Sequence, residues 1–376
     1  MKVRILITGG GSGGHIFPLV AIAKQLQQLA VKSNLELDLR YYGPQDIYTS
    51  YITREGVEAR AITPSKLRRY FSLKNFIDFP KFVFSIFQSL FKIYWFMPDV
   101  AFSKGGPGAL PVLMACRVYS IPVIIHDSDA VPGLTNTVSS RFARQIELSF
   151  ASAKKYFSTS KVVKVVGNPI REELLNYVSL DPMGAKERLK LDPKLPLILV
   201  LGGSLGSVRI NNFILTYLEK LLSKYQIVHQ VGTANLADVK KTFAAISRQM
   251  DPKIKKRYYP YAFLENKYGE MLAASDLVIA RSGAGTIFEL AAFGKSAILI
   301  PLPESARNHQ QMNAIEYSKT GAAEVLEENN LSEGVALRMI DKMIKNPGVQ
   351  MRQATLKFSK PKAAEMIAAD ILSLVR

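Results

Sequence analysis

Residues 3–15 read VRILITGGGSGGH, and this stretch decides the fold class of the chain. The apolar run at 3–8 is typical of a buried parallel strand, and glycines follow it immediately. Beyond them, apolar residues recur at helical spacing, at Leu19, Ile22, Ala23, Leu26 and Leu29. We place Pro18 in the first turn of this helix, where its missing N–H is not needed. A strand, a glycine loop and a helix in this order indicate an α/β unit.

The same order returns in the second half of the chain. Leu197–Leu201 reads as a strand, Gly202–Gly206 as a glycine loop, and a helix follows from about Arg209. Because 376 residues exceed the size at which a single core usually stops growing, we expect two domains. A predicted strand at 162–166 ends in Gly167-Asn168-Pro169, a combination that commonly marks a connection. We therefore predict two α/β domains with parallel sheets, over residues 1–168 and 169–350.

The formal net charge of +18 favours an anionic partner. Nucleic acid is the generic candidate for a basic protein. The basic residues are spread along the chain, however, and no compact basic helix or base-stacking motif occurs. We therefore rank anionic lipid and phosphorylated substrates above nucleic acid, and we expect no nucleic-acid partner.

The sequence carries no pattern for export and no membrane-spanning stretch. The apolar run Ile5–Ile7 ends in glycines, far short of a signal-peptide core. The most apolar stretch, 76–96, is interrupted by Asp78 and Pro80 among other residues. Cys116 is the single cysteine and can form no intramolecular disulfide, so a reducing compartment fits best. We expect a protein that stays in the cytoplasm.

The first glycine loop, residues 9–14, can be parsed as GxGxxG. In such a loop, backbone N–H groups approach a diphosphate at the helix N-terminus, but the signal alone is weak. A dinucleotide-binding domain also places an acidic residue at the end of its second strand. Here the candidate strand Leu35–Tyr42 ends in Arg40-Tyr41-Tyr42 and carries Asp38 in its middle, which disfavours an oxidoreductase.

Two histidines occur where α/β sheets bind ligands. His15 lies near a helix N-terminus, whose dipole disfavours the charged imidazolium, so it is a candidate general base. The alternative is a histidine that only satisfies loop carbonyls. His126 follows the predicted strand 121–125 and precedes Asp127-Ser128-Asp129, at the carboxyl edge of the sheet. These aspartates are either ligand contacts or turn formers.

The second half offers groups for sugar hydroxyls. A strand at 276–280, a loop at 281–286 and a helix at 287–293 place Glu289 in the first helical turn. A carboxylate there can accept hydrogen bonds from both ribose hydroxyls, while N–H groups face a phosphate. The alternative role of Glu289 is to stabilise the helix dipole. The loop after the next strand is rich in neutral polar residues between Arg307 and Asn313, which suit sugar hydroxyls.

Several chemistries lack their motifs. There is no cysteine and histidine cluster for zinc, no GxSxG turn of an acyl hydrolase and no GxxxxGK[ST] loop of a P-loop kinase. We predict no metal site and no cofactor. Two phosphate-sized glycine loops, with hydroxyl-binding residues on one side, fit the transfer of a group between two phosphate-bearing partners.

Short motifs occur in a fixed order along most of the chain. They are Gly10–Pro18, Phe102–Gly106, Pro132–Asn136, Gly167–Arg171, Gly202–Gly206, Arg281–Ala284 and His309–Asn313. Together they resemble the MurG family, whose members transfer GlcNAc from UDP-GlcNAc to lipid I, undecaprenyl-diphospho-MurNAc-pentapeptide. The ordered set is far more specific than either glycine loop.

The resemblance implies a GT-B architecture of two Rossmann-like, doubly wound domains facing each other across a cleft. A C-terminal helix at about 351–376 would pack back on the first domain. It also implies an inverting, metal-independent transfer to the MurNAc 4-hydroxyl, converting lipid I to lipid II in peptidoglycan synthesis. The implied partners are UDP-GlcNAc, lipid I and the anionic membrane surface, with the protein peripheral at the cytoplasmic face.

The resemblance assigns site residues as well. Contacts to UDP-GlcNAc map onto Ser12, Gly13, Gly14, Asp129, Arg171, Ser204, Leu264, Ala284, Gly285, Thr286, Ile287, Phe288, Glu289 and Gln310. The acceptor and its diphosphate map onto Gly11, His15, Asp127 and Asn136. Many family members have His-Glu-Gln-Asn at 126–129, so an aspartate here replaces an asparagine that contacts sugar. Pro107 stands where an aromatic residue often follows the glycine pair 105–106.

A helix predicted at 80–96 is too apolar to have a single buried face. Its polar residues form one narrow stripe, Lys81, Ser85, Gln88, Ser89 and Lys92. In one reading the helix dips into the bilayer beside basic residues that meet anionic headgroups. That reading uses Phe82, Phe87, Phe91, Trp95, Lys66, Arg68 and Arg69. The other reading buries the helix against the sheet. The resemblance, which includes a hydrophobic patch ringed by basic residues here, favours the membrane.

Other functions of the same fold stay open. One is a UDP-GlcNAc epimerase, which would need neither a lipid acceptor nor an aromatic helix. Another is a different UDP-sugar:lipid glycosyltransferase. A third is a non-catalytic scaffold that binds UDP-sugars at a membrane without releasing UDP.

Overall fold

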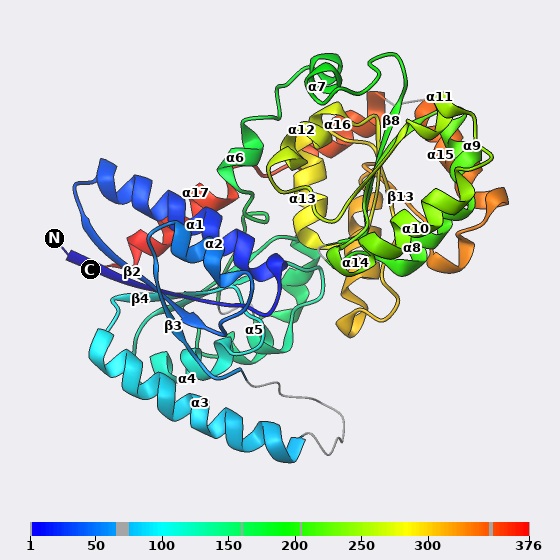
Figure 1. Cartoon of the computed structure of the whole chain (residues 1–376). Helices are drawn as coiled ribbons and strands as arrows, with labels where there is room; N and C mark the ends of the chain where they lie inside the picture. Colours follow the sequence, from blue (N-terminus) through cyan, green and yellow to red (C-terminus); the bar gives the residue numbers. More distant parts are fainter. Residues whose placement is uncertain (1, 65–74, 159–160, 204, 346–348, 376) are drawn as a thin grey trace. The chain divides into compact units, whose positions relative to one another are not determined.

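A computed structural model describes residues 2–64, 75–158, 161–203, 205–345 and 349–375. The described chain forms two compact units (Figure 1). Unit 1 comprises Met1–Arg171 and Lys360–Arg376, and unit 2 comprises Glu172–Ser359. Unit 2 is therefore one continuous stretch, whereas unit 1 is completed by the end of the chain.

In the described residues, unit 1 contains a seven-stranded parallel sheet in the order β3-β2-β1-β4-β5-β6-β7. Its strands are β1 (Lys2–Thr8), β2 (Glu36–Gly43), β3 (Glu58–Ala61), β4 (Val100–Ser103), β5 (Val123–Asp127), β6 (Gln145–Leu148) and β7 (Val162–Val165). Its helices are α1 (Gly13–Lys32), α2 (Thr49–Arg54), α3 (Asn75–Phe96), α4 (Ala109–Val118), α5 (Leu134–Ser139) and α17 (Ala363–Ser373), with a 3₁₀ turn at Ala151–Tyr156. Central β1 pairs Ile5 with Leu39 on one side and with Val100 on the other.

Alternate residues of β1 enter two cores, one on each face of the sheet. Ile5 and Ile7 pack with α1 and with Ile371 of α17, and Figure 1 shows these two helices side by side. Leu6 packs on the other face with Leu113 of α4 and Ile93 of α3. Burial on both faces explains why the strand reads as a continuous apolar run.

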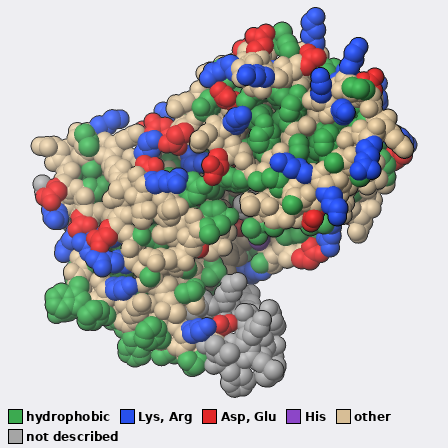
Figure 2. Space-filling model, in the orientation of Figure 1, with side chains coloured by type: hydrophobic (Ala, Val, Ile, Leu, Met, Phe, Trp, Pro, Cys, Tyr) green, Lys and Arg blue, Asp and Glu red, His purple; other side chains and the backbone are tan. Residues whose placement is uncertain are grey.

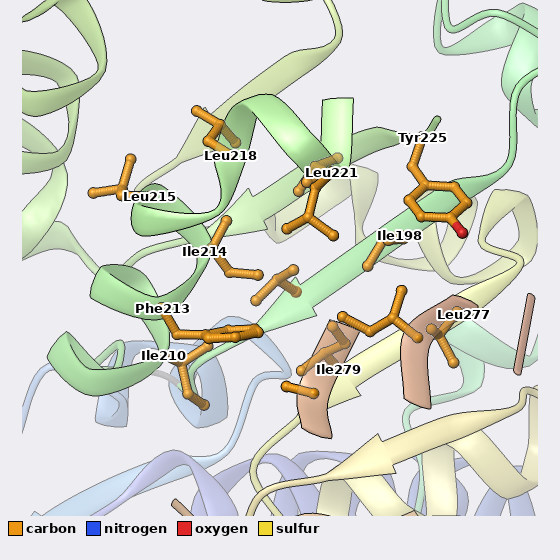
Figure 3. Close-up of a cluster of buried hydrophobic side chains, with 14 of the residues drawn as sticks. Ile198, Ile210, Phe213, Ile214, Leu215, Leu218, Leu221, Tyr225, Leu277 and Ile279 are labelled. Atoms are coloured by element: carbon orange, nitrogen blue, oxygen red, sulfur yellow. The ribbon is translucent and has the colours of Figure 1, made fainter. Parts of the chain in front are cut away.

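Unit 2, over its described residues, contains a six-stranded parallel sheet in the order β10-β9-β8-β11-β12-β13. Its strands are β8 (Leu197–Leu201), β9 (Gln226–Gln230), β10 (Tyr258–Tyr261), β11 (Leu277–Ala280), β12 (Ala297–Leu299) and β13 (Glu324–Val325). Its helices are α6 (Glu172–Leu175), α7 (Pro182–Arg188), α8 (Val208–Thr216), α9 (Leu218–Leu222), α10 (Leu236–Ile246), α11 (Pro252–Lys255), α12 (Tyr268–Ala274), α13 (Ala284–Phe293), α14 (His309–Ser318), α15 (Arg338–Lys345) and α16 (Val349–Phe358). Figure 3 shows Phe213 and Ile214 of α8 pointing into the core that contains Ile198 and Ile279 of the sheet.

Three predicted positions differ in the structure. Helix α1 begins at Gly13, so Pro18 lies inside the helix rather than in its first turn. Helix α13 begins at Ala284 rather than at 287, because Gly283 is extended and the chain turns helical directly after it. Glu289 therefore lies in the second turn. Strand β5 continues through Asp127, beyond the predicted strand end at 125, so His126 and Asp127 are buried strand residues, while the Asp127 carboxylate accepts from N–H groups of the loop that follows.

The C-terminal segment also differs from the single predicted helix at about 351–376. It contains two helices, α16 in unit 2 and α17 in unit 1. Pro361 lies between them, and proline both lacks an N–H and disfavours helical geometry in the preceding residue. Helix α17 packs against α1, whereas α16 packs against α13.

Candidate functional site

A buried tyrosine supports the glycine loop of unit 1, residues 9–14. The Tyr41 hydroxyl donates to the carbonyl of Gly9, and a Cβ on Gly10 would lie 2.9 Å from that hydroxyl oxygen. Burial raises the pKa of Tyr41, so the phenol stays protonated and remains a donor. The loop is therefore preformed at the N-terminus of α1, where backbone N–H groups suit an anion. Tyr41 was not among the predicted site residues, because in sequence it reads as an ordinary strand residue.

A second glycine loop, residues 105–108, lies against the first. Gly106 has φ +89°, and a Cβ there would lie 2.5 Å from the carbonyl oxygen of Gly10 and 3.3 Å from Nε2 of His15. Only glycine permits both that backbone conformation and that approach. The pair 105–106 thus brings the imidazole of His15 and the loop 9–14 together.

His15 lies within hydrogen-bond distance of the predicted contact residue Ser12. Its Nδ1 is 2.9 Å from the Ser12 hydroxyl oxygen. When Nδ1 carries the proton and donates to Ser12, Nε2 is the basic nitrogen, and it is the nitrogen nearest Gly106. The arrangement suits a general base whose ring orientation is fixed by a neighbour.

Asp127 and Asn136 fasten the loop that follows β5. The Asp127 carboxylate accepts hydrogen bonds from the backbone N–H groups of Asp129 and Gly133, both at 3.1 Å, and from the Asn136 side chain at 2.9 Å. Burial, together with the charge of Asp129, raises the pKa of Asp127 to about 6. Asn136 also packs against Gly105, where a Cβ would lie 2.8 Å from its Oδ1. Two of the predicted acceptor residues, Asn136 and His15, therefore lie against the glycine pair 105–106.

Lys104 follows β4 and contacts residues near the ends of β5 and β7. The sequence did not single it out as a site residue. Its buried ammonium donates to Asn168 at 3.0 Å and contacts Ser128 and Nδ1 of His126. The other His126 nitrogen lies 2.8 Å from the Gly167 carbonyl, to which it donates, so Nδ1 accepts from Lys104. Burial lowers the pKa of Lys104 to about 7 and that of His126 well below its usual value. His126 is thus a neutral structural histidine.

Arg171 lies at the end of unit 1, beside α1. Its guanidinium carbon is 4.5 Å from the ring centroid of Phe17, a cation–π contact. Its buried Nε has no hydrogen-bond partner among the described residues. Arg171 is therefore positioned by its stacking on Phe17.

Unit 2 contains a pocket of about 560 Å³ between its glycine loop and the N-terminus of α13. The pocket is lined by Gly202, Gly203, Leu205, Gly206, Ser207, Val208, Arg209, Arg281, Gly283, Thr286, Leu302, Glu304 and Gln310. Of the predicted contacts, Thr286 and Gln310 line it, while Ser204 lies outside the described residues. Ile287 and Phe288 point into the core with no exposure, and Ala284 is also buried. The N-termini of α8 and α13 both border this pocket, which suits an anion.

The amide of Gln230 holds two loops of unit 2 in place. Its nitrogen donates to the carbonyl of Gly203 at 3.1 Å, and its oxygen accepts from the N–H of Leu264 at 3.1 Å. Gly206 packs so closely that a Cβ would lie 1.9 Å from the carbonyl oxygen of Val231. The glycine loop and the predicted contact Leu264 are therefore fixed to the same strand, β9.

Glu289 and Gln310 are each oriented by a protein partner. Tyr268 donates to the Glu289 carboxylate at 2.7 Å from the neighbouring helix α12. The Gln310 side-chain oxygen accepts from the N–H of Leu302 at 3.0 Å, which fixes the amide at the pocket wall. Ser282 donates to the Gln310 carbonyl at 2.8 Å and so joins α14 to the loop before α13.

Two arginines and Glu304 line the pocket, and Glu328 contacts both arginines; the sequence did not reveal these pairings. Arg281 donates to Ser207 at 2.7 Å and contacts the buried carboxylate of Glu328. Arg209 pairs with Glu304 at 2.8 Å and also contacts Glu328. The Arg209 guanidinium lowers the pKa of the Glu304 carboxyl.

Helix α3 exposes its aromatic residues and buries its serines. Ser85 and Ser89 are fully buried, because each donates to a carbonyl of its own helix at 2.7 Å. Phe87 is 65%, Phe91 67% and Trp95 73% exposed, and Phe82 is half-buried. Figure 2 shows hydrophobic side chains gathered over this helix. The predicted polar stripe is thus partly the buried side. Lys66, Arg68 and Arg69 lie outside the described residues.

Membrane-spanning helices and clusters of metal ligands are both absent from the described residues. Over the described ranges, no helix is both long and apolar enough to cross a bilayer. Nowhere in the part of the chain that the structure describes do three or more His, Cys, Asp or Glu side chains gather as a metal site would require.

Comparison with known proteins identifies both halves of the chain. Residues 5–147 match the glycosyltransferase family 28 N-terminal domain, and residues 197–367 match the C-terminal domain of that family. Relatives from Clostridium botulinum (strain Loch Maree) and Clostridium tetani are each 36% identical over 348 residues. These matches cover 92% of this chain and 92% and 91% of the two relatives. Both are named UDP-N-acetylglucosamine--N-acetylmuramyl-(pentapeptide) pyrophosphoryl-undecaprenol N-acetylglucosamine transferase.

Solved structures share the fold. MurG of Acinetobacter baumannii aligns with a TM-score of 0.74 at 24% identity, over 99% of this chain and 100% of that one. A UDP-GlcNAc 2-epimerase from Neisseria meningitidis bound to UDP-GlcNAc aligns with a TM-score of 0.68 at 13% identity, over 99% and 100%. The parallel sheets and both domain matches establish the predicted GT-B fold. This chain is a glycosyltransferase of family 28 and belongs, with its clostridial relatives, to the MurG family.

Proposed function

We propose that this protein transfers GlcNAc from UDP-GlcNAc to the MurNAc 4-hydroxyl of undecaprenyl-diphospho-MurNAc-pentapeptide, with inversion at the anomeric carbon. The observation that carries the proposal is that each unit has its own preformed glycine loop at a helix N-terminus. A reaction between two diphosphate-bearing substrates needs two such places. The names of the clostridial relatives supply the identity of both substrates.

The donor is assigned to the pocket of unit 2. Its diphosphate lies over Gly202 and Gly203 and at the N-terminus of α13, where N–H groups and the helix dipole favour negative charge. Glu289 accepts from the ribose hydroxyls, in the orientation that Tyr268 fixes. The amide of Gln310 meets the sugar. Ser204, outside the described residues, and Ser12, Gly13, Gly14, Asp129 and Arg171 of unit 1 complete the proposed donor contacts.

The acceptor is assigned to unit 1. Its diphosphate is held by the backbone of loop 9–14, and the loop fastened by Asp127 and Asn136 contacts its sugar. His15 takes the proton of the 4-hydroxyl on Nε2 as the oxygen bonds to C1 of GlcNAc. The bond from C1 to the phosphate oxygen breaks, and its electron pair leaves with UDP. Protons and electrons balance without a further reactant.

The exposed aromatic face of α3 is proposed to contact the membrane that holds the lipid acceptor, at its cytoplasmic face. Phe87, Phe91 and Trp95 form a contiguous apolar surface on a helix that does not span the bilayer. The net charge of +18 favours anionic headgroups. Flotation with vesicles tests this: binding that does not depend on anionic lipid, or that survives Phe91→Ser with Trp95→Ser, contradicts it.

The reaction is tested with labelled UDP-GlcNAc and a soluble lipid I analogue. We expect UDP release only when acceptor is present, together with a labelled disaccharide product. Release of UDP with a different acceptor only would indicate another UDP-sugar:lipid transferase. Epimerised sugar formed without acceptor would indicate an epimerase, and nucleotide binding without any UDP release would indicate a scaffold.

A further inference from the structure

The two arginines that line the unit 2 pocket are held in different ways. Arg281 is nearly buried and donates to Ser207 at 2.7 Å and to the carbonyls of Ile300 and Pro301 at 3.2 Å, besides contacting Glu328. Since a guanidinium has five N–H donors, most of its capacity is used by the protein itself. Arg281 therefore joins the pocket walls and has little left for a ligand.

Arg209 is exposed, and its guanidinium pairs with two carboxylates, those of Glu304 and Glu328. Its two terminal nitrogens bind both oxygens of Glu304, at 2.8 and 3.3 Å, in a forked arrangement. One of them also contacts Glu328, whose side chain is only 4% exposed and is shared with Arg281. The side chains of Arg209 and Glu304 are 55% and 60% exposed. Glu304 can therefore swing into solvent, whereas Glu328 stays in place and keeps Arg209 at the pocket.

A forked pair between guanidinium and carboxylate has the same geometry as one between guanidinium and phosphate. Arg209 and Glu304 both line the pocket, next to the glycine loop and the first turn of α8. With Glu304 in place, the formal charges of Arg209, Arg281, Glu304 and Glu328 cancel. When Glu304 leaves, the pocket gains one positive charge, as a diphosphate requires.

We propose that Glu304 is a built-in substitute for the donor diphosphate. In the empty pocket Glu304 pairs with the two terminal nitrogens of Arg209. The diphosphate of UDP-GlcNAc binds the same nitrogens and displaces Glu304. Arg209 is thus a further diphosphate-binding residue, and Glu304 is a competitor that lowers donor affinity. The inference rests on the proposed donor site in unit 2.

Calorimetric titration of the full-length chain with UDP-GlcNAc, UDP and uridine tests the exchange. Glu304→Gln removes the competing charge and should tighten UDP and UDP-GlcNAc about 3-fold, the size of an exposed ion pair. Arg209→Gln should weaken both about 10-fold, because it removes a charged hydrogen-bond donor. Uridine, which has no phosphate, should bind all variants alike. In the double variant the gain from Glu304→Gln should vanish, because the two residues act as a pair.

Glu333→Gln is the matched control. It removes a similarly exposed carboxylate, 54%, from its ion pair with Lys220, and neither residue lines the pocket. Donor affinity should not change. The inference is overturned if Glu304→Gln leaves UDP affinity unchanged or weakens it, or if Arg209→Gln weakens uridine as much as UDP. If the wild-type chain binds no UDP-GlcNAc, the donor assignment fails as well. If the wild-type chain transfers GlcNAc normally but Glu304→Gln leaves UDP affinity unchanged, this inference fails while the proposed function stands.

Discussion

The glycine loop of unit 1 and that of unit 2 each join a parallel strand to a helix, but their surroundings differ in charge. Around loop 9–14 the close side chains are the hydroxyls of Tyr41 and Ser12, the imidazole of His15 and the carboxylate of Asp46, which accepts from the N–H of Gly11. Around Gly202 and Gly203 the pocket includes two arginines, one of them paired with an exposed glutamate.

The proposed reaction explains the difference. The acceptor diphosphate keeps its charge throughout, so backbone N–H groups are enough to hold it. The donor diphosphate gains negative charge as UDP leaves, and cations placed beforehand stabilise that developing charge. One backbone arrangement thus serves both for holding a group that does not react and for stabilising a leaving group, depending on the side chains beside it.

The largest expected effect comes from adding a methyl group at Gly106, which packs against loop 9–14, or at Gly206 in the glycine loop of unit 2. Gly106→Ala places a Cβ 2.5 Å from the Gly10 carbonyl oxygen, and Gly206→Ala places one 1.9 Å from that of Val231. We expect each to lower turnover by at least about 100-fold, because reacting groups are displaced by an ångström or more. In calorimetry, only Gly206→Ala should abolish UDP binding.

Gly56→Ala is the control for both substitutions. Gly56 also has a positive φ, +74°, but nothing lies within 4 Å of a Cβ there. It should lower stability through backbone strain alone and leave kcat unchanged. Equal loss of kcat in Gly56→Ala and Gly106→Ala would mean that strain, rather than the approach of the two loops, is decisive.

The next effect is expected at the glycine loop of unit 1. His15→Ala should lower kcat on the order of 10²-fold, because it removes the group that takes the hydroxyl proton. UDP affinity should stay the same, since His15 is assigned to the acceptor and not to the donor. Ser12→Ala, which removes the partner of Nδ1, should give a smaller loss. A His15→Ala enzyme that works at full speed would assign the base to another residue.

A smaller effect is expected at the ribose. Glu289→Ala should weaken UDP about 10-fold, the size of hydrogen bonds to a charged group. With 2′-deoxy-UDP the loss should shrink, because one of the hydroxyls is absent. Tyr268→Phe removes the 2.7 Å hydrogen bond that orients the carboxylate and should act in the same direction, more weakly. Unchanged affinity in Glu289→Ala would leave the helix dipole as its role.

The smallest expected effect is a difference between the two units in how their stability depends on pH. In unit 1, burial and the neighbouring Asp370 raise the pKa of Glu147 to about 8, from an ordinary 4.5. Its folded pKa lies above its unfolded pKa, so Glu147 should lower the stability of unit 1 between about pH 4.5 and 8, whereas the lowered pKa values of His126 and Lys104 act in the opposite direction. In unit 2, burial lowers the pKa of Lys295 to about 8, from 10.5. There the folded state prefers the neutral amine, so stability should rise between about pH 8 and 10.5.

Hydrogen exchange measured separately for peptides of each unit, from pH 5 to 10, checks both slopes. Glu147→Gln should flatten the decline in unit 1, and Lys295→Met should flatten the rise in unit 2. Gln145 and Lys164, which also contact Asp370, stay unchanged in these variants. A Glu147→Gln or Lys295→Met variant whose pH profile matches that of the wild type would contradict the assignment.

The sheets and glycine loops could be predicted because parallel strands buried on both faces leave continuous apolar runs that end in glycine. The five-residue strand 197–201 was placed at its observed bounds for this reason. The start of α13 could not be predicted as well, because Gly283, Ala284 and Gly285 have the composition of a loop. Glu289 was therefore placed one turn too early.

Contacts between residues far apart in the sequence could not be predicted either. Arg209, Glu304 and Glu328 come from separate segments, and no local pattern in the sequence indicates that they meet. Tyr41 and Lys104 likewise gain their roles only when neighbouring strand ends come together. On α3, counting apolar positions could not reveal that Ser85 and Ser89 satisfy their hydroxyls within the helix and take the buried side.

The placement of α17 has a consequence for synthesis. The core of unit 1 includes Ile367 and Ile371, which leave the ribosome after every residue of unit 2. Domains usually mature in the order of translation. Here the inserted second half can finish folding while the first half still waits for its last helix. A released chain that ends before Ala363 should therefore have a second half that is protease-resistant and a first half that is not.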